Sequence, residues 1–151
     1  MEVIEYKKEY QPIFQNLNLE WLNKYFKVEP IDTQVLSDPE NYIIKPGGFI
    51  YFVKYNGEII ATAAMRVSGE NELELTKMAV DAKFHGLGAG KFLCSTMIEK
   101  AKQTGCERLI LYSNKRLYAA IHIYKKLGFI EIPLKAGIYE RADIKMEIVF
   151  A

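Results

Sequence analysis

The sequence is short of cysteine, of net charge and of long apolar runs, and each shortage excludes a class of protein. Its 151 residues include two cysteines, Cys94 and Cys106. They lie in different predicted elements and form no C-x-x-C pair, so they indicate neither a disulfide framework nor a metal site. We expect Cys94 to be a core residue of a helix, Cys106 to be a small buried residue, and the functional site to hold no metal.

Net charge is almost absent, at +1 with a pI near 7.7. This balance gives no support to general nucleic-acid binding. Basic residues do gather in 83–102 and 115–126, either as two solvated helix faces or as a rim that faces a polyanion. No apolar run approaches the roughly 18 residues of a membrane helix, and the first residues lack the basic and apolar regions of a signal peptide. We therefore expect a soluble, cytoplasmic protein that binds neither membrane nor nucleic acid.

Apolar residues are abundant by contrast. Half of the residues are hydrophobic and 13% are aromatic, which is enough for one sizeable core and argues against disorder. No internal repeat, linker or low-complexity segment divides the chain. We therefore predict a single domain over residues 1–151.

Hydrophobic periodicity predicts helices and strands along the whole chain. The expected strands are 2–6, 49–55, 58–67, 72–80, 108–112, 129–134 and 142–150. The expected helices are 10–26, 29–36, 91–104 and 117–127. In helix 91–104 the apolar spacing predicts these inward-facing residues: Phe92, Leu93, Met97, Ile98 and Ala101. Asn56-Gly57 is a strong signal for a two-residue hairpin. A helix connects 72–80 to 108–112, so these two strands should be parallel neighbours. The fold class is therefore α/β (α+β), with one mixed sheet flanked by helices.

The most informative stretch is the turn between strand 72–80 and helix 91–104. Gly86, Gly88 and Gly90 occupy three of its five positions. A strand, a glycine turn and a helix together expose free backbone N–H groups at the helix N-terminus. These groups and the positive end of the helix dipole suit an anion, above all a phosphate. Glycine is needed because the backbone must approach the ligand closely.

Two familiar phosphate loops do not fit this turn. A Walker loop needs G-x-x-x-x-G-K-[S/T], whereas Gly90-Lys91 is followed by Phe92, which has no hydroxyl for Mg²⁺. A dinucleotide-binding loop needs G-x-G-x-x-G in the first unit of an alternating β-α-β chain. Here a three-stranded meander comes first and the spacing is G-x-G-x-G.

In this context the turn resembles the phosphate loop of the GCN5-related N-acetyltransferase (GNAT) family, and the chain looks like a bacterial subgroup of it. The residues that carry the resemblance are His85-Gly-Leu-Gly-Ala-Gly90 and Ala120-Ile-His-Ile-Tyr-Lys-Lys-Leu-Gly-Phe129. The order of predicted elements matches the family along essentially the whole chain. The resemblance implies a GNAT fold, with a mostly antiparallel sheet and a splayed central parallel pair. It also implies an acetyl-CoA-dependent N-acetyltransferase.

The resemblance further implies how acetyl-CoA binds. The pyrophosphate would lie on the glycine turn, and the pantetheine arm would add to a bulged strand whose N–H near Met78 polarises the thioester carbonyl. The implied cofactor-binding residues are Met78, Ala79, Val80, His85, Gly86, Leu87, Gly88, Ala89, Gly90, Lys91 and Asn114. His85 stands where the family has Gln or Arg, so its side chain is either a ligand contact or an exposed loop residue. Asn114 lies ten residues before Tyr124, whereas many relatives have an Asn seven residues before that tyrosine.

Two catalytic residues are implied as well. Tyr124 would donate a proton to the departing thiolate, the alternative being a tyrosine packed on the apolar helix face. Glu74 aligns with the catalytic glutamate of the histone-acetyltransferase branch and would be the base, with Glu72 on the same strand face. The alternative for Glu74 is an exposed strand carboxylate. We expect direct transfer in a ternary complex, because Cys94 and Cys106 are not placed to carry an acetyl group.

The acceptor groove is expected beside residues 137–143. On position alone, Tyr139 and Arg141 are candidates to contact a carboxylate of the acceptor. Glu29 and Asp32 would either attract a cationic acceptor, or be solvated or cap a helix. The expected partner is a primary amine on a small molecule or peptide, with a homodimer and a donor other than acetyl left open. The alternative to an enzyme is a non-catalytic acyl-CoA-binding sensor or interaction module on the same scaffold.

Overall fold

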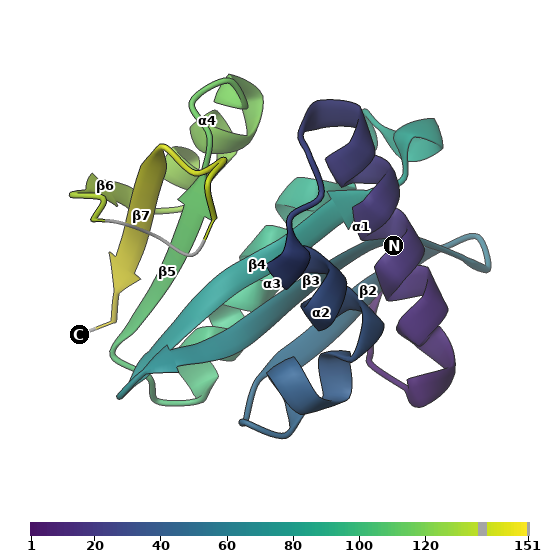
Figure 1. The fold of residues 1–151 in the computed structure, drawn as a ribbon, viewed down its shortest axis with the longest axis horizontal. Coiled ribbons are helices and arrows are strands. Elements are labelled where there is room, and N and C mark those ends of the chain that lie inside the picture. Colours follow the sequence, from purple (N-terminus) through teal and green to yellow (C-terminus); the bar gives the residue numbers. More distant parts are fainter. Residues whose placement is uncertain (136–138, 151) are drawn as a thin grey trace.

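Seven strands form one sheet in the order β1-β2-β3-β4-β5-β7-β6 (Figure 1). The structure is a computed structural model that describes residues 1–135 and 139–150. The strands are β1 (Glu2–Glu5), β2 (Phe49–Tyr55), β3 (Glu58–Gly69), β4 (Glu72–Val80), β5 (Arg108–Ser113), β6 (Ile130–Ile132) and β7 (Ile144–Val149). The helices are α1 (Gln11–Tyr25), α2 (Pro30–Ser37), α3 (Ala89–Gln103) and α4 (Tyr118–Lys126), with single turns η1 (Lys8–Tyr10), η2 (Glu40–Ile44) and η3 (Ala82–Phe84).

The antiparallel meander β2-β3-β4 confirms the predicted hairpin. Asn56 and Gly57 join β2 to β3 with φ angles of 49° and 81°, the left-handed pair that a two-residue primed turn requires. β4 and β5 pair in parallel, as the connecting helix predicts. The predicted order of helices and strands is confirmed.

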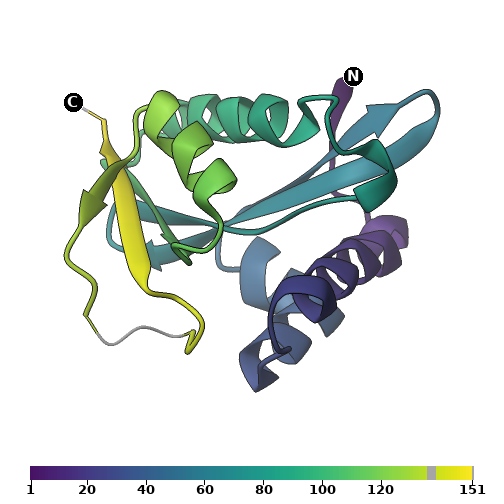
Figure 2. The same cartoon turned by 90° about the horizontal axis from the view of Figure 1, so that it is seen from above.

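Helices cover both faces of the sheet (Figure 2). α3 and α4 lie on one face, and α1 and α2 lie on the other. Successive side chains of a strand point to opposite faces. Along β2, therefore, Tyr51 and Val53 join the hydrophobic cluster under α3, whereas Ile50 and Phe52 join the cluster under α1 and α2. Burial on both sides explains why β2 is a nearly continuous apolar run.

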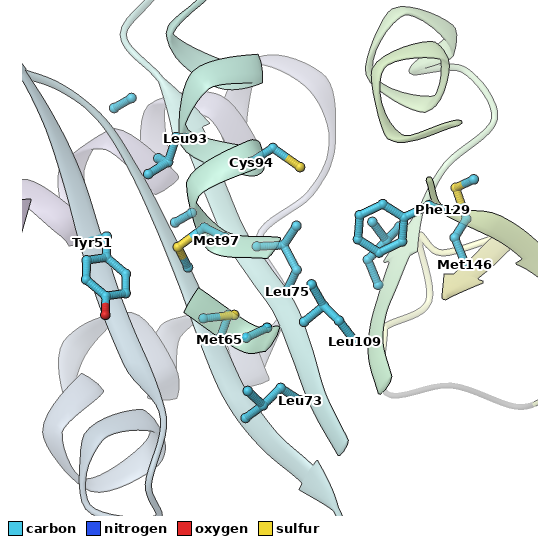
Figure 3. Packing of buried hydrophobic residues seen from close by; sticks show 14 of the residues in the cluster. Tyr51, Met65, Leu73, Leu75, Leu93, Cys94, Met97, Leu109, Phe129 and Met146 are labelled. Atoms are coloured by element: carbon cyan, nitrogen blue, oxygen red, sulfur yellow. The ribbon is translucent and has the colours of Figure 1, made fainter. Parts of the chain in front are cut away.

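The contact between α3 and the sheet is the larger core (Figure 3). Leu93 and Met97 are fully buried four residues apart on one helix face, and burying such a side chain stabilises the fold by about 1.5–3 kcal/mol. Cys94 is buried beside them, as expected. Phe92 was expected to point inward but is 37% exposed. It precedes Leu93 by one residue, which turns it about 100° around the helix, away from the sheet.

A bulge interrupts β4 where that strand leaves β5. Thr62 of β3 pairs with Ala79 and Ala64 pairs with Thr76, so Lys77 and Met78 together oppose one residue. In the described chain the β4–β5 ladder ends at Leu75, and beyond it the two strands diverge (Figure 1). This divergence opens the central sheet at the carboxyl ends of both strands.

Several predicted bounds differ from the observed ones. α3 begins at Ala89, two residues before the predicted start, because Gly90 is helical and does not belong to the turn. The last two strands are shorter than predicted, and β7 lies between β5 and β6. Cys106 is only half-buried. Within the described residues, no helix combines the length and the apolar character needed to cross a bilayer.

Candidate functional site

A cleft of about 770 Å³ lies where β4 and β5 diverge. Its walls come from β4, the glycine turn, the ends of β5 and α1, and α4. This size is typical of a small-molecule site. The sequence-predicted residues that line it are Glu74, Met78, Ala79, Val80, His85, Gly86, Gly88, Ala89, Gly90, Lys91, Asn114 and Tyr124. Leu87 does not line the cleft and is 42% exposed.

The glycine turn leaves the N-terminus of α3 open. Gly86 and Gly88 have φ angles of 89° and 78°, a left-handed conformation that favours glycine. Gly88 is the N-cap of α3, and in the described chain no side chain caps it. The first N–H groups of a helix have no partner within the helix, so those of Ala89, Gly90 and Lys91 are available to an anion. His85 and Lys91 are exposed at the lip of this turn.

The edge of β4 that faces the divergence is a second open backbone segment. In the described chain, residues 76–80 of β4 have no pairing partner in β5. An unpaired strand edge can hold an extended ligand through main-chain hydrogen bonds. Met78 and Val80 pack their side chains against the core under α3, so the backbone is what this segment offers to a ligand.

Tyr124 lines the cleft from α4. Its ring packs edge-to-face on Phe129, with centroids 5.8 Å apart. Burial, with a smaller contribution from Cys94, raises the pKa of the Tyr124 phenol far above its usual value. The group therefore keeps its proton at neutral pH.

Glu74 is a buried carboxyl group with a side chain that is 1% exposed, so the alternative of an exposed strand carboxylate is wrong. Its Oε1 lies 3.1 Å from Arg66 Nε, and its Oε2 accepts a long hydrogen bond of 3.5 Å from the Tyr139 hydroxyl. Although Arg66 is close, Oε1 has no hydrogen bond among the described residues. Burial raises the pKa of Glu74, although the charges of Arg66 and Lys77 act in the opposite direction. Such a carboxylate is suited to accept a proton from a group in the cleft.

Glu72, the neighbouring carboxylate on the same strand, lies outside this cleft. It accepts hydrogen bonds from Arg108 and from the Ser68 hydroxyl. The two carboxylates of β4 therefore have separate surroundings, and Glu74 alone lies at the site.

A buried ionic cluster joins the bulge of β4 to α2 and to the segment before β7. Lys77 Nζ donates to Asp32 Oδ1 at 2.7 Å. Arg141 donates to both oxygens of Asp32, at 2.8 and 2.9 Å, and to Glu29 Oε2 at 2.8 Å. Burial alone would raise the pKa of Asp32, but the hydrogen bonds from Arg141 and the charge of Lys77 outweigh it and hold that pKa at about 2. The burial of Lys77 lowers its own pKa.

Sequence reasoning missed Lys77. The signal was present, since Lys77 lies in a strand predicted to have a neighbouring strand on each side, and a buried lysine needs a carboxylate partner. For Glu29 and Asp32 the capping role is confirmed, because they form a reciprocal capping box at the start of α2. Both carboxylates are in addition neutralised by Arg141.

The Tyr139 ring contacts two cations. Its ring centroid is 4.8 Å from Lys77 Nζ and 4.7 Å from the Arg141 guanidinium. Burial and the charge of Glu74 raise the pKa of Tyr139 to about 12. Tyr139 thus connects the ionic cluster to the buried carboxylate. Of the expected acceptor segment, residues 137 and 138 lie outside the described residues.

The connection between β5 and α4 closes the other side of the cleft. Asn114 donates from Nδ2 to the Arg141 carbonyl at 2.7 Å and accepts from the Arg116 N–H at 2.9 Å, so both ends of its amide are engaged within the protein. Arg116, which was not among the predicted site residues, stacks on Phe26 at 4.6 Å and donates to the Tyr25 carbonyl at 3.1 Å. Arg116 thereby links this connection to the end of α1. Among the described residues, no group of three or more His, Cys, Asp or Glu side chains is arranged to hold a metal ion.

Comparison with known proteins gives matches over most of the chain. A family model described as the Acetyltransferase (GNAT) family matches residues 13–129. Rat N-acetylaspartate synthetase is 32% identical over 96 residues, which are 62% of this chain and 32% of that protein. The chain thus spans about a third of the length of the N-acetylaspartate synthetases that it matches.

Solved structures show the same fold at low sequence identity. A GNAT-family acetyltransferase from Staphylococcus aureus has a TM-score of 0.84 at 21% identity, over 97% of this chain and 96% of that one. A Bacillus subtilis acetyltransferase in complex with CoA has a TM-score of 0.77 at 17% identity, over 99% of each chain. The mixed sheet with one parallel pair is therefore an arrangement that these proteins share.

The ionic cluster predicts how stability depends on Asp32. In Asp32→Asn, Lys77 and Arg141 lose their carboxylate, and we expect the free energy of unfolding at pH 7 to fall by about 3 kcal/mol. The Asp32 pKa is held at about 2, below its ordinary 3.8, so its stabilising contribution is present above about pH 4 and is lost as the pH falls toward 2. Urea unfolding should therefore show that the difference in the free energy of unfolding between wild type and Asp32→Asn becomes smaller as the pH falls from about 4 toward 2.

Asp38, at the opposite end of α2, supplies the control. Its side chain accepts only from Asn41 among the described residues, so Asp38→Asn should change the free energy of unfolding by no more than about 0.5 kcal/mol. If the difference in the free energy of unfolding between wild type and Asp32→Asn stays constant from pH 7 to pH 2, the lowered pKa of Asp32 is contradicted.

Proposed function

Because the chain belongs to the Acetyltransferase (GNAT) family, we propose that it catalyses direct transfer of an acetyl group from acetyl-CoA to a primary amine. The observation that carries the proposal is that one cleft holds an open helix N-terminus, an unpaired strand edge and a buried carboxylate. The N-acetylaspartate synthetases support an amine acceptor, since their name describes an N-acetylated product.

The shape and chemistry of the cleft suit acetyl-CoA. The N–H groups of residues 88–91 would bind the pyrophosphate, with His85 and Gly86 at the lip and Leu87 contributing its backbone only. The edge of Met78, Ala79 and Val80 would pair with the pantetheine arm as an added strand. Acetyl-CoA supplies the activated thioester. Asn114 would act by holding the loop beside this arm, since its amide is engaged within the protein.

In the reaction, Glu74 would accept one proton and Tyr124 would donate another. The amine nitrogen bonds to the thioester carbon, and Glu74 takes the proton that the nitrogen must lose. The N–H near Met78 stabilises the charge that develops on the carbonyl oxygen. When the carbon–sulfur bond breaks, Tyr124 gives its proton to the sulfur, so that the leaving group departs as a neutral thiol.

A change at Gly88 tests the binding of acetyl-CoA. Glu at this position adds a negative charge where the pyrophosphate would lie and introduces a side chain at a φ of 78°. We expect isothermal titration calorimetry to show acetyl-CoA binding weakened at least tenfold in Gly88→Glu, which corresponds to about 1.4 kcal/mol.

Gly105 provides a matched control at the other end of α3. It has a φ of 81° and open space around its Cβ position, so Gly105→Glu introduces the same charge with similar backbone strain. The 15-residue helix separates the two glycines by about 22 Å. If the two variants bind acetyl-CoA with equal affinity, the pyrophosphate does not bind at the glycine turn.

Tyr124→Phe tests the proton donor. We expect kcat to fall by about 10²-fold or more, with little change in the dissociation constant of acetyl-CoA, because only the hydroxyl is removed. Stopped-flow or steady-state assays of thiol release would measure this. Tyr42→Phe, at an exposed tyrosine outside the cleft, should keep the wild-type kcat. If both variants have the wild-type kcat, Tyr124 has no part in the chemistry.

The pH dependence of kcat/KM tests Glu74. Since the ionised form is the base, kcat/KM should rise as the pH passes upward through the raised pKa of Glu74. Arg66 lowers this pKa, so Arg66→Gln should move the rising limb to higher pH. The pKa of a free amine does not depend on Arg66, and an unmoved limb would therefore exclude Glu74 as its origin. Glu74→Gln should lower kcat by about 10²-fold or more.

A broad amine panel separates the enzyme from the acyl-CoA sensor. Tight binding of acetyl-CoA without acetylation of any amine would favour the sensor. Acetylation that depends on Glu74 and Tyr124 would favour the enzyme.

A further inference from the structure

Cations outnumber carboxylates along the part of the cleft that lies away from the glycine turn. The charged residues that line this part are Glu74, Lys77, Arg116 and Arg141. In the part of the chain that the structure describes, no acidic residue other than Glu74 lines the cleft. A ligand at this end therefore meets three basic side chains and one carboxylate.

The carboxylates that neutralise two of these cations lie behind the lining. Asp32 is completely buried, and neither Asp32 nor Glu29 contributes to the surface of the cleft. They fix the positions of Lys77 and Arg141 without using all of their donors. Arg141 makes three hydrogen bonds from its five N–H groups, and Lys77 makes one from its three, among the described residues. Both cations are therefore held in place with donors to spare. The Arg141 side chain is 18% exposed and the Lys77 side chain 3%, so Arg141 is the more accessible of the two.

Arg116 adds a third cation at the rim. It forms no ion pair with a carboxylate in residues 1–135 and 139–150, and its guanidinium is held by Phe26 and the Tyr25 carbonyl instead. When a guanidinium stacks on an aromatic ring, the N–H donors along its edge remain available to a ligand. Its charge is therefore not neutralised by a partner in the described protein.

We infer that the acceptor amine also carries a carboxylate, as a free amino acid does. This inference rests on the proposed function and names the substrate class of the same cleft. Arginine and lysine are the side chains suited to carboxylate recognition. Glu74, which lines the same cleft, provides a carboxylate of the opposite charge for the amine. Tyr139 touches Glu74 on one side and the two cations on the other, so one side chain separates the two kinds of group.

The same lining disfavours a polycation. A polyamine presents several ammonium groups, of which Glu74 would pair with one. The others would face Lys77, Arg116 or Arg141, and like charges at close range cost binding free energy. The lining thus discriminates between two classes of amine through repulsion as well as attraction.

Paired acceptors test the inference. Thiol release from acetyl-CoA is measured with a panel of L-amino acids, each beside its carboxamide, and with spermidine. For the amino acids that react best, we expect kcat/KM at least tenfold above that of the carboxamide, and no measurable reaction of spermidine. The α-amine of a carboxamide is less basic than that of the free amino acid, so a larger fraction of it is neutral and able to attack. Amine reactivity alone would therefore favour the carboxamide.

Two neighbouring charge changes locate the recognition. Arg116→Gln should raise KM for the preferred amino acid about threefold to tenfold and leave KM for its carboxamide unchanged. Lys115→Gln is the matched control, because Lys115 carries the same charge next in sequence but does not line the cleft. Both side chains are exposed, so both variants should fold.

The outcomes separate this inference from the proposed function. Equal use of amino acids and carboxamides, a preference for spermidine, or equal KM changes in the two variants would overturn the inference and leave the acetyltransferase standing. Absence of acetylation with every amine would overturn both. A carboxylate preference that Arg116→Gln weakens and Lys115→Gln does not supports it.

Discussion

The rest of the site depends on the bulge in β4 and on the ion pair between Lys77 and Asp32 that holds this bulge. Lys77 occupies the bulge with a φ of 53°, a left-handed conformation that costs a side chain with a Cβ about 1–3 kcal/mol. Its ammonium group is bonded to Asp32 at 2.7 Å. The same carboxylate accepts two hydrogen bonds from Arg141. One buried aspartate therefore fixes the bulge, the start of α2 and the segment before β7 relative to one another.

This arrangement gives the two walls of the cleft different chemistry. The wall on the side of α3 offers backbone N–H groups and an unpaired strand edge. These groups do not depend on the type of side chain, and they suit a large cofactor. The wall formed by α1, the segment before β7 and the β5–α4 connection offers aromatic rings and fixed cations. Glu74 and Tyr124 both line the cleft, Glu74 from β4 and Tyr124 from α4. The fold thus places open backbone groups and fixed charged side chains on different walls of a single cleft.

Much of the fold and part of the site could be predicted from the sequence, because the relevant signals are local. Asn56-Gly57 determined the hairpin through its backbone preference, and the spacing of Leu93 and Met97 determined which face of α3 is buried. The glycine turn and the Tyr-x-x-x-Gly-Phe pattern pointed to the residues that line the cleft, Leu87 excepted. The errors were also local: Phe92 lies beside the buried face of its helix, and Gly90 belongs to the helix rather than to the turn.

What the tertiary structure alone decided is the partner of each polar group. The sequence shows that Glu74 precedes the glycine turn, but not that burial raises its pKa or that one of its oxygens pairs with Arg66. It shows Asp32 at a helix start, but not its bonds to Lys77 and Arg141, which lie 45 and 109 residues away. Periodicity and turn preferences act between neighbouring residues, whereas the pairing of charges depends on how distant elements pack and on the low dielectric that packing creates.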